Sequence, residues 1–373
     1  REKWLWYLPY AKLPLEALGG LREHFRDWLV NHHRDRFGFI GNFSKIDLPV
    51  HHRTGWYDRL IGTTRMYTHM INEAPSEHAR ANQRLFIGPY THANEMTRVT
   101  GDMDFGPDAE IDWVELATPW FDYWLKDTGA GVMDEPPVFI FVMGENRWRH
   151  ENEWPLARTH YTRFYLHADS PANTRQGAGT LSTAPPWEEP PDSYVYDPAD
   201  PVPTRGGNTL IIPQGVADQG SVEDRQDVLV YTSETLIQEM EITGPIKVRL
   251  FAASSAADTD FTAKLVDVRP DGYAHNLQDG IIRASCRYSV AQPSPIKPGH
   301  VYEYEIDLWS TSHVLRPGHR LRLEISSSNL PRFDRNPNTG APLGQDSRLA
   351  VANQTVYHSA AHPSHILLPI IPR

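Results

Sequence analysis

VYEYEIDLW, residues 301–309, is the stretch that decides the fold class of most of this 373-residue chain. Every second position holds an apolar or aromatic residue, namely Tyr302, Tyr304, Ile306 and Leu308. Acidic residues lie between them. Successive side chains of a β-strand point to opposite faces of a sheet, so this alternation predicts a strand with one buried and one solvated face.

Two other stretches show the same alternation, HRLRLEISS at 319–327 and IKVRLFA at 246–252. Turn-forming clusters such as PADPVPTRGG and RPDG separate the runs. Many short strands with one wet face and Pro/Gly punctuation are typical of an antiparallel β-sandwich. We therefore expect residues 137–373 to form a β-sandwich, most simply a jelly roll.

The chain before this part has a different pattern. Within residues 36–130 we expect a strand around 48–55, a helix over 59–72, a strand at 84–87 and a second helix in 112–131 that Gly129 closes. Alternating strands and helices indicate a parallel α/β sheet. Only about two strand–helix units fit, so these residues are expected to be the end of a larger α/β domain.

Residues 1–35 are rich in Trp, Leu, Arg and Glu. Apolar residues recur there at three- or four-residue spacing, which predicts amphipathic helix interrupted or started at Gly19-Gly20. The first residue is Arg1 and not Met, so we expect further sequence upstream.

Composition excludes several classes of function. The net charge of −11 and pI of about 5.9 argue against nucleic acid or an anionic membrane as the main partner. No apolar run approaches the roughly eighteen residues of a membrane span, and no signal peptide opens the chain. The single cysteine, Cys286, cannot form an intrachain disulfide. We expect a cytoplasmic protein.

Two residues follow the two predicted strands of the α/β part. Asp58 ends the run Thr-Gly-Trp-Tyr-Asp at 54–58, and His92 ends Gly-Pro-Tyr-Thr-His at 88–92. Adjacent parallel strands end side by side, so the two side chains can meet. A carboxylate bonded to an imidazole fixes its tautomer, as a catalytic base requires. Asp before His matches the last two places of the Ser, Asp, His order of α/β-hydrolases.

The nucleophile of such a triad is missing. The strained G-x-S-x-G elbow does not occur, and the nearest miss, Ser44, has Asn42 and Ile46 where the glycines belong. We therefore expect the nucleophilic Ser upstream of these residues.

Other polar residues have structural alternatives. His32-His33, His51-His52 and His69 lack metal-ligand spacing, so no metal site and no cofactor are expected. Asp258 and Asp260 more simply satisfy a strand–turn than bind calcium.

A structural role is also a possible explanation for Asp58, for three tryptophans and for Cys286. Asp58 could also be the N-cap of the following helix. The tryptophans at 113, 120 and 124 have helical spacing, which favours core packing over an acyl pocket. Cys286 is expected to be an inert, buried or half-buried thiol in a strand.

The motifs at 54–58 and 88–92 resemble the acid and histidine motifs of the cocaine esterase-like (CocE/NonD) acyl hydrolases, which belong to the X-Pro dipeptidyl-peptidase class of serine hydrolases. The resemblance continues through most of the chain, in VFIFVMGENRWRHENEWP at 138–155, YDPADPVPTRGG at 196–207, DTDFTAKLVDVRPDG at 258–272, PGHRLRLEISSSNLPRFDRNPNTG at 317–340 and HPSHILLPII at 362–371.

The resemblance implies three parts. Residues 1–35 are the end of a helical cap, 36–130 the C-terminal part of an α/β-hydrolase domain, and 137–373 a jelly-roll β-sandwich. The family's G-x-S-Y-x-G elbow and oxyanion-hole Tyr lie upstream of the cap. Asp58 and His92 correspond to the triad acid and base.

The expected function is that of a serine hydrolase acting on small-molecule carboxylic esters, with this chain alone inactive. Relatives that bind a substrate ammonium carry extra carboxylates near the triad Asp, whereas Arg59, Leu60 and Ile61 follow Asp58 here. This departure favours a plain carboxylic ester, without an ammonium group, as the substrate. The alternatives are an X-Pro dipeptidyl-peptidase, which needs a site for the free amine of a peptide, and a non-catalytic binding module, since jelly rolls also serve lectins.

Overall fold

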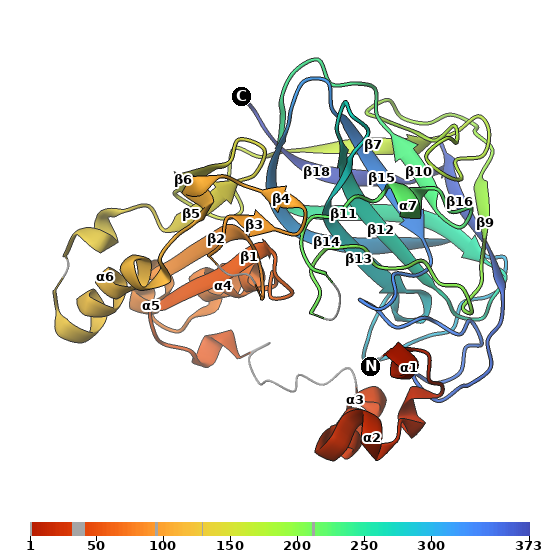
Figure 1. Ribbon diagram of the computed structural model, residues 1–373, viewed down its shortest axis with the longest axis horizontal. Helices are drawn as coiled ribbons and strands as arrows, with labels where there is room; N and C mark the ends of the chain where they lie inside the picture. Colours follow the sequence, from red (N-terminus) through yellow and green to blue (C-terminus); the bar gives the residue numbers. More distant parts are fainter. Residues whose placement is uncertain (1, 32–41, 94–95, 129, 211–212) are drawn as a thin grey trace.

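The computed structural model describes residues 2–31, 42–93, 96–128, 130–210 and 213–373. Three parts follow one another along the chain: a group of N-terminal helices, a small α/β unit and a large all-β unit (Figure 1). Among the described residues, no helix has both the length and the apolar composition needed to cross a bilayer.

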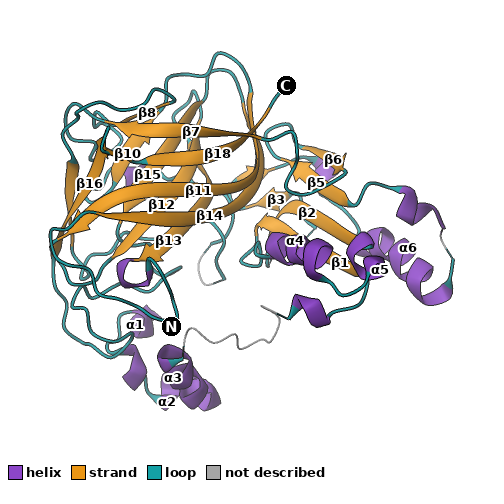
Figure 2. Cartoon of the chain, turned by 180° about the vertical axis from the view of Figure 1, so that it is seen from behind, coloured by secondary structure: helices purple, strands orange, loops and turns teal. Residues whose placement is uncertain are grey.

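The N-terminal helices pack against loops at one end of the all-β unit (Figures 1 and 2). Ala11 N–H donates to Gly344 O at 2.8 Å, and Arg335 donates to Trp6 O at 2.9 Å. A helix break at Gly19-Gly20 is confirmed, because a short 3₁₀ turn separates the second helix from the third. The helices are α1 (Glu2–Leu5), α2 (Leu15–Leu18) and α3 (Arg22–Val30).

The α/β unit is built on a four-stranded sheet in the order β1-β2-β5-β6, whose first three strands are parallel. Successive residues of β1 point to opposite faces of the sheet, and each contacts a helix on its own face. His52 contacts Tyr67 of α4, and His51 contacts Trp113 of α6. The elements are β1 (Val50–Tyr57), α4 (Thr63–Glu73), α5 (Glu77–Ala81), β2 (Gln83–Thr91), β3 (Val99–Thr100), β4 (Met103–Asp104), α6 (Trp113–Lys126), β5 (Val138–Val142) and β6 (Arg147–Glu151).

Three local expectations differ from the structure. The helix expected from residue 59 begins at Thr63, because a tight turn occupies 59–62. The helix α6 ends at Lys126 and is capped by Asp127, whose backbone is left-handed with φ of 57°; Gly129 lies outside the described residues. The expected start of the sandwich at 137 falls inside the α/β sheet, since β5 pairs with β2 and β6 with β5.

The all-β unit is a twelve-stranded sheet that curls back over a large apolar core. Strand β13, at one end of the sheet, approaches β14 at Gly280, where an added Cβ would lie 2.1 Å from Asp307 O. A largely antiparallel β fold is thus observed, with only β8 and β10 paired in parallel among the named strand pairs, while its jelly-roll connectivity stays a prediction. The elements are β7 (His160–His167), β8 (Thr180–Ser182), β9 (Asp192–Tyr196), α7 (Gly220–Glu223), β10 (Leu229–Thr232), β11 (Met240–Ser254), β12 (Asp260–Val268), β13 (Ala274–Arg283), β14 (Tyr302–Leu315), β15 (Arg320–Ser326), β16 (Ala352–Ser359), β17 (His362–Pro363) and β18 (His365–Ile371).

The expected alternation is confirmed for β14, in which Tyr304, Ile306 and Leu308 are in the core. It is wrong for the outer face of β15, because Arg322 and Glu324 are both buried. There α7 covers the sheet. Arg322 pairs with Glu223, and Lys264 of β12 donates to Glu324 at 3.1 Å. Charged residues can be buried there because opposite charges lie beside them.

A second apolar core joins the two units. It contains Trp56, Ile87 and Phe141 from the α/β sheet together with Val216 and Ile371 from the all-β unit. The carboxyl ends of β1 and β2 therefore lie against the all-β unit and not in open solvent.

Candidate active site

The site lies where β1 and β2 end. The two strands are paired in parallel, with Thr54 opposite Ile87 and Tyr57 opposite Thr91. The register shifts between Gly55 and Tyr57. Gly55 is required there, because an added Cβ would lie 2.2 Å from Tyr90 O.

Asp58 and His92 are the first residues after these two strands, and their side chains meet. His92 Nδ1 lies 3.2 Å from Asp58 Oδ1 and 3.4 Å from Oδ2. The Asp58 side chain is 5% exposed and that of His92 is 40% exposed. A buried carboxylate thus holds Nδ1 of an accessible imidazole, which leaves Nε2 as the nitrogen that can take a proton from a nucleophile.

Asp58 is not a helix N-cap. Its Oδ1 accepts the Leu60 N–H at 2.9 Å within the turn that follows β1, and Gly62 precedes α4. The alternative role considered for Asp58 is therefore wrong, and the carboxylate instead closes the turn that presents it to His92.

The all-β unit holds the end of β1. Asn208 Nδ2 donates to Asp58 O at 2.8 Å, and Gln278 Nε2 donates to Trp56 O at 2.6 Å. The Tyr57 hydroxyl donates to Asn276 O at 2.9 Å. These partners lie 150 or more residues from β1 in sequence, and no motif in the chain pointed to them.

The three described histidines that were considered as metal ligands, His51, His52 and His69, have separate surroundings. His51 and His52 lie on opposite faces of β1. Burial lowers the pKa of His51 to about 4, and His52 Nε2 lies 2.9 Å from Gln83 Oε1. His69 contacts Glu73 on an exposed face of α4. His32 and His33 fall outside the described residues.

Asp258 and Asp260 have structural partners. Asp258 accepts the Ser285 N–H at 2.8 Å, and Arg283 Nε donates to Asp260 at 2.8 Å. Asn336 donates to both carboxylates, at 3.2 and 2.9 Å. The expected strand–turn role fits these contacts, because a guanidinium already neutralises Asp260.

Cys286 and the tryptophans of α6 have structural surroundings. Cys286 is half-buried, and burial raises its thiol pKa, but it lies in a 3₁₀ turn and not in the strand that was expected. Trp113 and Trp120 both pack against His51, and Trp120 is buried. The contacts of these two tryptophans are those of core residues.

Comparison with known proteins assigns the chain to a family. Residues 130–367 match the model of the X-Pro dipeptidyl-peptidase C-terminal non-catalytic domain. Cocaine esterase from Rhodococcus sp. (strain MB1 Bresler) is 41% identical over 377 residues, which cover 98% of this chain and 64% of that protein.

Two solved structures are similar over nearly the whole chain. An aminopeptidase from the marine sediment archaeon Thaumarchaeota archaeon has a TM-score of 0.83 at 28% identity, covering 96% of this chain and 62% of its own. An α-amino acid ester hydrolase has a TM-score of 0.78 at 28% identity, and the match covers 95% of this chain and 61% of that protein. This chain spans less than two thirds of each of these three proteins. The chain belongs to the cocaine esterase-like (CocE/NonD) hydrolases and carries the C-terminal domain of the X-Pro dipeptidyl-peptidase class.

Proposed function

We propose that this chain supplies the acid and the base of a serine carboxylic ester hydrolase, whose nucleophilic Ser lies in sequence outside these 373 residues. One observation carries the proposal. The Nδ1 atom of a 40% exposed His92 lies 3.2 Å from the buried carboxylate of Asp58, at the carboxyl ends of adjacent parallel strands. In an α/β sheet these ends are where substrates bind.

The mechanism follows from this geometry. His92 Nε2 takes the proton of the Ser hydroxyl as its oxygen attacks the ester carbonyl, and Asp58 stabilises the imidazolium that forms. The tetrahedral intermediate collapses, and His92 returns the proton to the leaving alcohol. Water then attacks the acyl-enzyme, again losing a proton to His92, and the acid leaves with the Ser hydroxyl restored. No cofactor takes part in these steps.

The surroundings of Asp58 support a plain ester as substrate. Arg59 and Leu60 are exposed and Ile61 is buried in the core, so the turn after Asp58 brings no carboxylate for a substrate ammonium. The relative with 41% identity is named for cleaving cocaine, which is an ester.

A peptidase is the second candidate. It is favoured by the TM-score of 0.83 to an archaeal aminopeptidase and by the X-Pro dipeptidyl-peptidase domain. The two candidates share Asp58 and His92, so relative rates on 4-nitrophenyl acetate and on an amino-acyl anilide separate them. A pure binding module would not need the Asp58–His92 pair.

The test uses the full-length protein that contains this chain. We expect Asp58→Asn and His92→Ala each to lower kcat for 4-nitrophenyl acetate by about 10³- to 10⁴-fold, and the exposed His300→Ala to leave it unchanged. Activity retained in His92→Ala would contradict the assignment.

The 373-residue chain is tested separately with a fluorophosphonate probe and intact-mass spectrometry. We expect no labelling, because the proposed nucleophile lies elsewhere. A labelled serine in this chain that is lost in His92→Ala would overturn the proposal that the nucleophile is outside it.

A further inference from the structure

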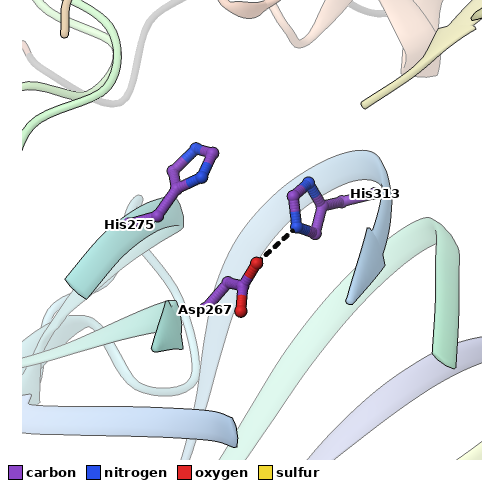
Figure 3. Close-up of side chains that lie close together, drawn as sticks. All are labelled: Asp267, His275 and His313. Carbon is purple, nitrogen blue, oxygen red and sulfur yellow. Dashed lines mark hydrogen bonds and ion pairs between the residues drawn. The ribbon is translucent and has the colours of Figure 1, made fainter. Parts of the chain in front are cut away.

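A group of three potential metal ligands lies in the all-β unit beneath the end of β1. Asp267 of β12, His275 of β13 and His313 of β14 are 1%, 2% and 3% exposed. One donor atom from each lies within 4.8 Å of the others (Figure 3). Nothing in the sequence marks the group, because its members lie on three different strands and span 46 residues from Asp267 to His313.

The bonding of Asp267 and His313 leaves one buried nitrogen without a partner. His313 Nε2 lies 2.9 Å from Asp267 Oδ2, and His319 Nδ1 lies 2.7 Å from Oδ1. Among the described residues, His313 Nδ1 is buried and has no hydrogen-bond partner. A neutral ring leaves a lone pair unsatisfied there, and a charged ring leaves an N–H unsatisfied. Buried polar atoms rarely remain in either state.

His275 is anchored by a hydrogen bond to Tyr57. The Tyr57 hydroxyl donates to Asn276 O at 2.9 Å, so its oxygen accepts the N–H of His275 Nε2 at 2.8 Å. A neutral ring whose Nε2 carries the proton has its lone pair on Nδ1, and such an anchored imidazole is the form in which histidine binds metals.

A cavity gives access to the group. It has a volume of about 440 Å³, and Asp267, His275, His313 and His319 all line it. Its other polar groups include Asn146 and Asp271. Arg269 and Arg316 also line it and weaken the attraction for a cation. Asp271 and the ion pair of Arg316 with Glu239 offset part of this positive charge.

We propose that Asp267, His275 and His313 form a structural binding site for a first-row divalent metal ion, with Zn²⁺ the best match. Two imidazoles and one carboxylate suit Zn²⁺, whose ligands stand about 3.3 Å apart in a tetrahedral site. Binding draws the three side chains together, and the cavity leaves room for water as the fourth ligand. The Tyr57 hydroxyl and the His319 ring orient His275 and Asp267 as outer partners.

The competing explanation needs no metal. In it, His313 and His319 each bond to one oxygen of Asp267, at 2.9 and 2.7 Å, and these bonds alone hold the buried carboxylate. That arrangement leaves the buried His313 Nδ1 atom without a partner, which a metal ion bound at Nδ1 would supply. The metal site does not depend on the esterase proposal, because none of its three ligands is part of the Asp58–His92 pair.

The test titrates the chelator-treated chain with Co²⁺ and follows the visible absorption of four-coordinate Co²⁺, then displaces it with Zn²⁺. We expect one Co²⁺ per chain, a spectrum lost on adding Zn²⁺, and a rise in Tm with Zn²⁺ concentration. His275→Ala and His313→Gln should abolish the spectrum. Tyr57→Phe, an outer partner, should weaken binding by about 10- to 100-fold.

Two controls keep the result interpretable. The exposed His300→Ala should bind Co²⁺ as the parent chain does. In His313→Gln the amide can still donate to Asp267, so an unchanged circular dichroism spectrum shows that this variant folds. Absence of saturable Co²⁺ binding in the parent chain, or binding unaffected by both His275→Ala and His313→Gln, would overturn the proposal.

Discussion

Single residues show how the candidate site is held. Asp58 and His92 could be paired from the sequence, because each directly follows a predicted strand of one parallel sheet. The contact of Asn208 with Asp58 could not be predicted from the sequence, because Asn208 lies 150 residues from the backbone carbonyl that it binds. It is 4% exposed and donates to both Asp58 O and Trp56 O, so it fixes the turn that carries the carboxylate.

Asn208→Ala in the full-length protein should therefore lower ester hydrolysis. We expect kcat to fall by about 10- to 100-fold with little change in KM, because a displaced Asp58 misaligns His92 without touching the substrate. Steady-state kinetics check this, with the exposed Asn353→Ala as the matched control. A kcat equal to that of the control would contradict a positioning role for Asn208.

His358 should make stability depend on pH. Its ring is fully buried between Asp192 Oδ2 at 2.9 Å and Glu189 Oε2 at 3.2 Å. Burial alone would lower its pKa, but the hydrogen bonds and charges of these carboxylates raise it above 6.5. The stabilisation is therefore fully present below pH 6.5 and is lost as the pH rises through the folded-state pKa.

Urea unfolding at increasing pH checks this. We expect the unfolding free energy of the parent chain to fall above about pH 6.5, by about 1.4 kcal/mol for each unit of the shift, and His358→Gln to flatten this dependence. His300→Gln, on the surface, should keep the parent profile. An equal slope in the parent and His358→Gln would rule out this source of the pH dependence.

Individual elements were predictable where one face meets an apolar core. The alternation in β14 and β11 predicted strands, and the four-residue spacing in α6 predicted a helix. The same reasoning failed for the outer face of β15, because α7 covers it and pairs Arg322 with Glu223. Charged residues that alternate with apolar ones along a strand predict a face exposed to solvent. In β15 that face is covered instead by α7, a segment distant in sequence.

Gly280 in β13 should be intolerant of a side chain. An added Cβ would lie 2.1 Å from Asp307 O of β14, a backbone atom that cannot rotate away. Gly280→Ala should force the two strands apart and lower the unfolding free energy by about 1–3 kcal/mol. Gly20→Ala, where no atom lies within 4 Å of the new Cβ, is the matched control. Equal stability of the two variants would contradict the close approach.

At the scale of the whole molecule, the α/β unit and the all-β unit share a core. Trp56 and Phe141 pack in one cluster with Val216 and Ile371, and Gln278 donates from β13 to Trp56 O. The domain that the family model describes as non-catalytic thus holds the strand that directly precedes Asp58.

We therefore expect the two units to unfold together. Calorimetry of the chain should show one main transition, with calorimetric and van't Hoff enthalpies that agree. Gln278→Ala should lower the unfolding free energy by about 0.5–1.5 kcal/mol, because Trp56 O loses one of its two side-chain donors and keeps Asn208 Nδ2, and should keep a single transition. Two resolved transitions in the parent chain would show that the shared core does not couple the units.

The sequence by itself determined the class of each part and the placing of Asp58 and His92, because alternation, helical spacing and chain order are local properties. It also contained the family motifs. The tertiary structure decided everything that depends on segments far apart in sequence: the covering of β15 by α7, the assignment of β5 and β6 to the α/β sheet, the bonds from Asn208, Gln278 and Tyr57, and the meeting of Asp267, His275 and His313. Hydrogen bonds and metal ligation act over about 3 Å, and only the folded chain brings such residues within that distance.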